Sequence, residues 1–125
     1  MKVSEVMNKA IAIENDLSLK KAARIMSSKN IGSLIILKKD KIAGIITDSD
    51  IMRNISSLGR KVNSIMSKKV VTIDCDETID NAALIMTRCK IKRLPVIEKG
   101  KLIGIITATD IIANSDVLNE DFLFE

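Results

Sequence analysis

The chain has 125 residues, of which 46% are hydrophobic and 29% charged, and its formal net charge is +4. This composition is typical of a globular protein, and the absence of His excludes His-based acid–base catalysis and His metal ligation. No apolar run approaches the roughly 20 residues of a membrane-spanning helix, and residues 1–5 form no apolar targeting signal. We therefore expect a cytoplasmic protein with no membrane partner.

The chain repeats itself at a spacing of 60 residues. Residues 13–54 match residues 73–114 at 17 of 42 positions without a gap. A single unit of this length is marginal on its own, so we expect two halves that cover each other's apolar faces. The repeat predicts domain limits at 1–57 and 62–114 and leaves a tail, 115–125, that has no counterpart in the first half.

In chain order, each repeat predicts a helical turn, an extended segment, a helix, a hairpin of two strands and a second helix. These elements are expected at residues 4–7, 10–13, 19–26, 34–37, 42–46 and from 47 onward, and again at 63–66, 70–73, 79–86, 94–97, 102–106 and from 107 onward. The order β-α-β-β-α, occurring twice, predicts an α/β fold with small sheets packed back to back.

The longer helix of each repeat carries an apolar stripe. Apolar residues recur at i, i+3, i+4 and i+7 counted from Leu19, and again counted from Ile79, which is the spacing of one helical face. Ser18 and Thr78 directly precede these helices and are expected to cap them. With no Trp or Tyr in the chain, the core beneath the stripes must be aliphatic.

The remaining features are less specific. Cys75 and Cys89 have no metal-type spacing and predict free thiols without a metal site. The basic residues are scattered and lack neighbouring aromatic residues, which disfavours a nucleic-acid surface. The tail contains Phe122 and Phe124, and its alternatives are a frayed terminus or a helix that docks on a partner or a second copy.

The strongest candidate for chemistry is the corner where the hairpin of each repeat meets its second helix. The segments 47–50 and 107–110 read Thr-Asp-Ser-Asp and Thr-Ala-Thr-Asp. Backbone N–H groups at such a junction attract phosphate, the hydroxyl groups add donors, and the Asp carboxylate can accept both hydroxyls of a ribose.

The same spacing has a structural alternative. Thr-x-x-Asp is also the spacing of a capping box, in which hydroxyl and carboxylate satisfy N–H groups of their own helix. Capping boxes more often carry Glu or Gln at the last position, whereas both copies carry Asp. Gly44 and Gly104 lie three residues before each Thr, where a side chain would block a close approach.

The segments 44–51 (GIITDSDI), 104–111 (GIITATDI) and 91–97 (IKRLPVI) resemble those of a pair of CBS domains, the arrangement called a Bateman module. The resemblance extends over about residues 3–114. It implies two β-α-β-β-α CBS repeats packed with pseudo-twofold symmetry, frequent homodimerisation, and regulatory binding of AMP, ADP, ATP, NAD or S-adenosylmethionine between the repeats.

The resemblance also implies two ligand sites, each pairing one corner with the pre-hairpin segment and first strand of the other repeat. Site one would comprise Thr47, Ser49, Asp50, Val70, Val71, Thr72, Ile91, Lys92 and Arg93. Site two would comprise Thr107, Thr109, Asp110, Ala10, Ile11, Ala12, Ile31, Gly32 and Ser33.

The two predicted sites differ in charge. Lys92 and Arg93 suit phosphate oxygens, whereas Gly32 and Ser33 occupy the same place in site two. We therefore expect site one to bind AMP, ADP or ATP more tightly. Asp48 would weaken that binding if its charge pointed toward the phosphate.

Three functions compete. The favoured one is a regulatory module without catalysis and without a required cofactor, which senses an adenosyl-containing ligand and acts on a separate, unidentified protein. An enzyme is disfavoured because no nucleophile–base pair is visible, and Asp74, Asp76 and Glu77 are interpreted as charge complementing a helix dipole. A nucleic-acid-binding or purely structural interaction protein is the remaining alternative.

Overall fold

The computed structural model describes residues 1–115, so the predicted tail, apart from Ser115, lies outside the described residues. The chain divides into two units. The first-repeat unit comprises Ile11–Val70, and the second-repeat unit comprises Met1–Ala10 together with the chain from Val71 onward.

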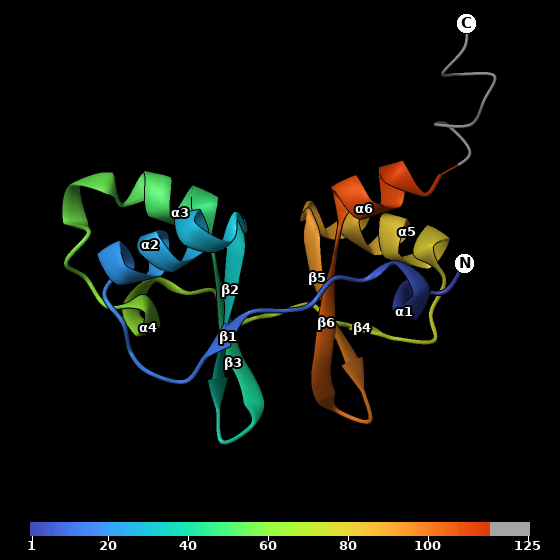
Figure 1. Cartoon of the computed structure of the whole chain (residues 1–125), viewed down its shortest axis with the longest axis horizontal. Coiled ribbons are helices and arrows are strands. Elements are labelled where there is room, and N and C mark those ends of the chain that lie inside the picture. Colours follow the sequence, from blue (N-terminus) through green and yellow to red (C-terminus); the bar gives the residue numbers. More distant parts are fainter. Residues whose placement is uncertain (116–125) are drawn as a thin grey trace, which may run out of the picture. The chain divides into compact units, whose positions relative to one another are not determined.

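The first-repeat unit places its helices over a three-stranded sheet (Figure 1). The strands lie in the order β1-β2-β3; β1 is parallel to β2, and β2 is antiparallel to β3. The elements are β1 (Ala12–Ile13), α2 (Leu19–Lys29), β2 (Ser33–Lys38), β3 (Lys41–Thr47), α3 (Asp48–Arg53), a 3₁₀ turn (Ile55–Ser57) and α4 (Val62–Ile65).

The second-repeat unit has the same topology. Its strands lie in the order β4-β5-β6, with a parallel and then an antiparallel pairing and an irregularity in the hairpin at the matching place. The elements are α1 (Val3–Val6), β4 (Ile73–Asp74), α5 (Ile79–Cys89), β5 (Arg93–Glu98), β6 (Lys101–Thr107) and α6 (Ala108–Ala113). The predicted α/β class is thus confirmed, with a three-stranded sheet and covering helices in each unit.

Local chemistry explains why α2 and α5 begin and end where they do. The side chains of Ser18 and Thr78 accept hydrogen bonds from backbone N–H groups in the first turn, as predicted. Asn30 and Lys90 follow the helices in the left-handed conformation, with φ of 52° and 55°. A residue in this conformation ends the helix and turns the chain into the next strand.

Each unit has its own aliphatic core, as the composition predicted. Of the described residues, the buried core of the first-repeat unit comprises Leu19, Ala22, Met26, Leu34, Ile36, Ile46, Ile51 and Val62. The buried core of the second-repeat unit comprises Val3, Ile73, Cys75, Ile79, Ala82, Met86, Leu94, Val96 and Ile106.

The helical turns of the two repeats are exchanged between the units. Val3, from the start of the chain, is fully buried in the second-repeat unit, where its N–H donates to the Glu77 carbonyl at 2.8 Å. Val62 is fully buried in the first-repeat unit, where its N–H donates to the Leu17 carbonyl at 2.8 Å. Figure 1 shows the blue N-terminal segment with α1 among the elements of the second repeat. The compact units therefore differ from the sequence repeats at this point.

The exchanged segments also pair with strands. Asn8 forms a bridge with Ile105 on β6, and Ser67 forms the equivalent bridge with Ile45 on β3. Each bridge consists of two backbone hydrogen bonds of 2.8–3.0 Å. Within the described residues, none of the helices combines the length and the apolar character needed to cross a membrane.

Candidate functional site

The corner between β3 and α3 is organised around the carboxylate of Asp50. Thr47 is the N-cap of α3, and its hydroxyl accepts a 3.4 Å hydrogen bond from the Asp50 N–H. In return, Oδ2 of Asp50 accepts from the Thr47 N–H at 2.8 Å and from the Thr47 hydroxyl at 3.1 Å. The capping box considered from the sequence is therefore present, and it buries Asp50 to 8% exposure.

The corner between β6 and α6 repeats this arrangement. Thr107 accepts from the Asp110 N–H at 3.2 Å, and Oδ2 of Asp110 accepts from the Thr107 N–H at 2.9 Å and the Thr107 hydroxyl at 2.8 Å. Asp110 is half-buried. Both corners thus use one carboxylate oxygen to close the first turn of their own helix.

The two carboxylates differ in their third partner. Oδ1 of Asp50 accepts a hydrogen bond of 2.7 Å from Nη2 of Arg53, forming an ion pair one turn along α3. Oδ2 of Asp110 instead accepts a hydrogen bond of 2.7 Å from Nδ2 of Asn8, on the exchanged N-terminal segment. Sequence reasoning missed both partners, although the repeat displays the difference: Ala113 stands at the position of Arg53, and Ser67 at that of Asn8.

Within the first-repeat unit, the Thr47 corner lies beside its own pre-hairpin segment. Ser33 is the cross-strand partner of Thr47, and the Asp48 N–H donates to the Gly32 carbonyl at 2.9 Å. Farther along the sheet, Ile35 pairs with Ala12 and donates its N–H to the Ile11 carbonyl. Ile31, Gly32, Ser33, Ile11 and Ala12 therefore share a unit with Thr47, Ser49, Asp50 and Val70.

Within the second-repeat unit, the Thr107 corner likewise lies beside its own pre-hairpin segment. Arg93 is the cross-strand partner of Thr107, and the Ala108 N–H donates to the Lys92 carbonyl at 2.9 Å. Ile91, Lys92, Arg93, Val71 and Thr72 therefore share a unit with Thr107, Thr109, Asp110 and Ala10. The structure thus brings together members of both predicted sites in each unit, and the assignment of corners to the other repeat's segments stays a prediction.

The two glycines serve the fold itself. A Cβ at Gly104 would lie 2.8 Å from the carbonyl oxygen of Asn8 and 2.7 Å from the sulfur of Met7. A Cβ at Gly44 would collide with Met66 and lie 3.0 Å from the carbonyl oxygen of Ser67. The close approach expected at these glycines is therefore made by the exchanged segments of the chain.

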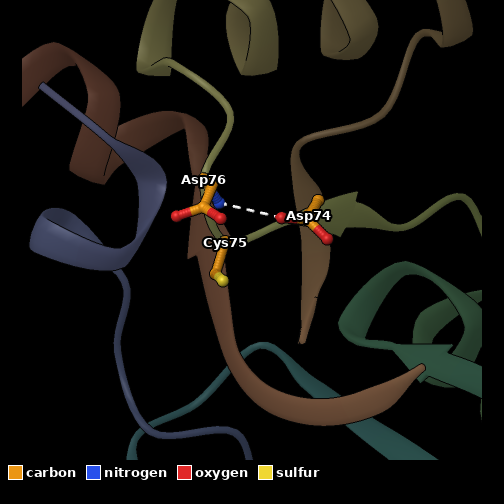
Figure 2. Close-up of side chains that lie close together, drawn as sticks. All are labelled: Asp74, Cys75 and Asp76. Carbon is orange, nitrogen blue, oxygen red and sulfur yellow. Dashed lines mark hydrogen bonds between the residues drawn. The ribbon is translucent and has the colours of Figure 1, made fainter. Parts of the chain in front are cut away.

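A second group of side chains lies at the entry of α5 in the second-repeat unit. Asp74, Cys75 and Asp76 offer ligand atoms within 4.8 Å of one another (Figure 2). The Asp76 N–H donates to Oδ1 of Asp74 at 3.0 Å, and Asp76 lies 3.6 Å from the Lys2 ammonium. This turn explains why the two carboxylates lie close together. They lie in the loop that enters α5, where the sequence predicted them.

Cys75 is held as a neutral thiol. Its Sγ lies 3.4 Å from Oε2 of Glu98, to which the thiol donates. Burial, the hydrogen bond to Glu98 and the nearby carboxylates of Asp76 and Asp74 together raise the pKa of Cys75 from 9.0 to about 11, and burial contributes most. A neutral thiol is a poor nucleophile and a poor metal ligand.

The comparison with known families decides what the repeated unit is. The CBS domain family matches residues 3–57 and again residues 62–116. The chain belongs to the CBS domain family. Its two CBS repeats account for the element order, the twin corners and the matching hairpins.

Relatives and solved structures agree with this assignment. The chain is 34% identical over 114 residues to the MJ1232 protein of Methanocaldococcus jannaschii, and 39% identical over 112 residues to a homoserine O-acetyltransferase of Methanohalobium evestigatum. These matches cover 90% and 87% of this chain but only 38% and 23% of those relatives.

A solved structure matches over most of its length. The CBS domain pair of protein MJ0100, in complex with 5′-methylthioadenosine and S-adenosyl-L-methionine, superposes with a TM-score of 0.85 at 30% identity. The match covers 90% of this chain and 94% of that one. The chain is thus a CBS domain pair in fold as well as in sequence.

Proposed function

We propose that this CBS pair is a regulatory module that binds an adenine nucleotide between its two repeats and acts on a separate partner protein. The observation that carries the proposal is the similarity to the MJ0100 pair over 90% of this chain, because that pair was solved with two adenosyl ligands. Both corners of this chain carry the hydroxyls and carboxylates that the resemblance assigns to phosphate and ribose. The module needs no catalysis of its own, because binding alone can shift a conformational equilibrium.

The ligands of the MJ0100 pair favour a second candidate within the same class. 5′-Methylthioadenosine and S-adenosyl-L-methionine contain adenosine without phosphate. The chain would then sense an adenosyl compound through adenine and ribose alone. NAD remains a third adenosine-containing ligand implied by the resemblance.

A thermal-shift screen separates these candidates. AMP, ADP, ATP, NAD and S-adenosylmethionine are each added to the folded protein, and a ligand at 100 times its Kd stabilises it by about 2.7 kcal/mol. Stabilisation by the first three supports the nucleotide proposal, and stabilisation only by S-adenosylmethionine supports the second candidate. An unchanged melting temperature with all five ligands contradicts both.

We propose further that site one binds phosphorylated ligands more tightly, through Lys92 and Arg93. Arg93 pairs across the hairpin with Thr107 in its own unit, so its assignment to the Asp50 corner depends on the family resemblance. A double-mutant cycle tests that assignment: Arg93→Ala is combined with Asp50→Ala or with Asp110→Ala, and ATP affinity is measured by calorimetry. Coupling with Asp50 supports site one as predicted, whereas coupling with Asp110 reassigns Arg93 to the corner of its own unit. Unchanged affinity in both Arg93→Ala and Asp50→Ala contradicts site one.

Homodimerisation is the remaining part of the proposal. We expect two copies to associate, since the resemblance implies dimers. Analytical ultracentrifugation with and without the bound nucleotide measures the mass directly. A monomer at all concentrations would contradict this part alone. The regulated partner and the cytoplasmic location stay predictions.

A further inference from the structure

The two corner carboxylates differ in which of their oxygens accept hydrogen bonds. The hydrogen bonds to the Asp110 carboxylate, from the Thr107 N–H, the Thr107 hydroxyl and Asn8, all end on Oδ2. Within the described part of its own unit, Oδ1 of Asp110 has no hydrogen-bond partner. The bonds to Asp50 are divided, with the Thr47 donors on Oδ2 and the Arg53 guanidinium on Oδ1.

The difference originates in two substitutions between the repeats. Arg53 lies one turn after Asp50 on α3, and Ala113 occupies the same position on α6. The shorter side chain cannot reach the carboxylate. In its place, the amide of Asn8 approaches Asp110 from the exchanged segment, and it binds the oxygen that Thr107 already uses. Among the described residues of its own unit, Asp110 thus retains an oxygen with both of its acceptor positions open, whereas both oxygens of Asp50 are engaged.

We infer that Arg53 sets the ribose affinity of the first-repeat corner, by competing with the ligand's cis-diol for Oδ1 of Asp50. A carboxylate accepts about four hydrogen bonds, two on each oxygen, and a cis-diol brings two donors. At Asp110 both donors find open positions, so the second-repeat corner is prepared for ribose. At Asp50 one position is taken by a charge-assisted bond of 2.7 Å, which must be shared or broken.

The expected effect is modest because the Arg53 side of the competing ion pair is accessible to water. The Arg53 side chain is 69% exposed. Exposed ion pairs contribute up to about 1 kcal/mol, so releasing Asp50 from Arg53 should raise ribose-dependent affinity about two- to fivefold. This inference rests on the proposed function, and it concerns the ribose only. Lys92 and Arg93 would act on phosphate, so a ligand without phosphate separates the two effects.

The experiment uses adenosine and 2′,3′-dideoxyadenosine, which differ only in the two ribose hydroxyls. Affinities are measured by calorimetry in two backgrounds, each leaving one corner carboxylate. Asp110→Asn leaves Asp50, and Asp50→Asn leaves Asp110; Asn keeps an oxygen for the capping N–H. Adding Arg53→Ala to the first background should strengthen adenosine binding about two- to fivefold and leave dideoxyadenosine unchanged.

The matched variant works in the opposite direction. Adding Ala113→Arg to the second background installs the missing competitor and should weaken adenosine binding by a similar factor. Arg53→Gln serves as a second variant, with circular dichroism to verify folding. If Arg53→Ala leaves adenosine affinity unchanged or lowers it, or shifts both ligands alike, the inference is wrong while the proposed function stands. If neither these ligands nor any in the thermal-shift screen binds the folded wild-type chain, the proposed function fails, and this inference with it.

Discussion

The two units share the same sheet topology but differ in the side chains that contact their corner carboxylates. In the first-repeat unit, Asp50 is paired with Arg53 from its own helix. In the second-repeat unit, Asp110 is bound by Asn8, which arrives from the start of the chain. Duplication therefore preserved the strands, corners and caps, while the polar contacts around each corner diverged. A repeat can thus keep its fold while the contacts of its two corners become unequal.

The largest expected effect tests the exchange of helical turns. Val3→Asp places a charge in the core of the second-repeat unit and should lower the free energy of unfolding by about 3–5 kcal/mol. Hydrogen exchange should accelerate in β4–β6 and α5. Val62→Asp is the matched variant and should accelerate exchange in β1–β3 and α2. Met1→Asp, at a residue 61% exposed, is the control. Faster hydrogen exchange in β1–β3 for Val3→Asp would contradict the placement of Val3 in the second-repeat unit.

The next effect tests the close approach of the exchanged segments. Gly104→Ala forces a Cβ against the backbone carbonyl of Asn8 and should cost about 1–3 kcal/mol in urea denaturation. Gly44→Ala meets mainly the flexible Met66 side chain, so we expect a smaller loss. Gly59→Ala meets no atom within 4 Å and should change little. Equal stability of the Gly104 and Gly59 variants would show that the segment does not approach this closely.

Alkaline pH should affect the two units differently, because the thiol of Cys75 has no counterpart at the equivalent position of the first repeat. Asn15 stands in the first repeat where Cys75 stands in the second. The pKa of Cys75 is about 11 in the fold and 9.0 ordinarily, so the unfolded chain loses this proton first as pH rises. The stability contributed by the neutral thiol is complete below pH 9 and is lost between pH 9 and 11. Melting curves should show this loss in the wild type and not in Cys75→Val; identical pH profiles would contradict it.

The smallest effect concerns the hairpin turns. Lys39 and Asp40 have φ of 52° and 63°, and Lys99 and Gly100 have φ of 49° and 78°. Two consecutive residues with positive φ favour glycine. Asp40→Gly should therefore stabilise the first-repeat unit by about 0.5 kcal/mol, and Gly100→Asp should destabilise the second by a similar amount. Denaturation midpoints that move in the same direction for both variants would contradict this explanation.

The sequence predicted what depends on local pattern. The apolar stripe from Leu19, the cap at Ser18 and the hairpin reversal at Lys39 each follow from residues close together in the chain, and all three are present. The capping alternative at Thr47 was also visible, because its partners lie three residues apart. The twin corners are therefore predictable as structural elements from the sequence alone.

Contacts between distant residues were beyond the same reasoning. Asn8 and Asp110 are 102 positions apart, and no periodicity of the sequence links the Asn8 side chain to that carboxylate. Likewise, the burial of Val3 in the second-repeat core follows from the path of the chain, which neither hydrophobicity nor spacing specifies. Arg53 is the exception, since aligning the repeats shows Ala113 in its place. Both repeats must be compared residue by residue to find such differences.

The exchange of helical turns has a consequence for how the protein is made. Residues 11–70 are continuous and leave the ribosome in one stretch, so this unit can collapse as soon as α4 has emerged. Segment 1–10 is synthesised earlier, yet its partners at residues 75–79 come about 70–80 residues later, and its partner on β6 comes more than 90 residues later. At about 5–20 residues per second, segment 1–10 waits several seconds for its docking surface. Segment 1–10 thus precedes in synthesis most of the unit into which it packs.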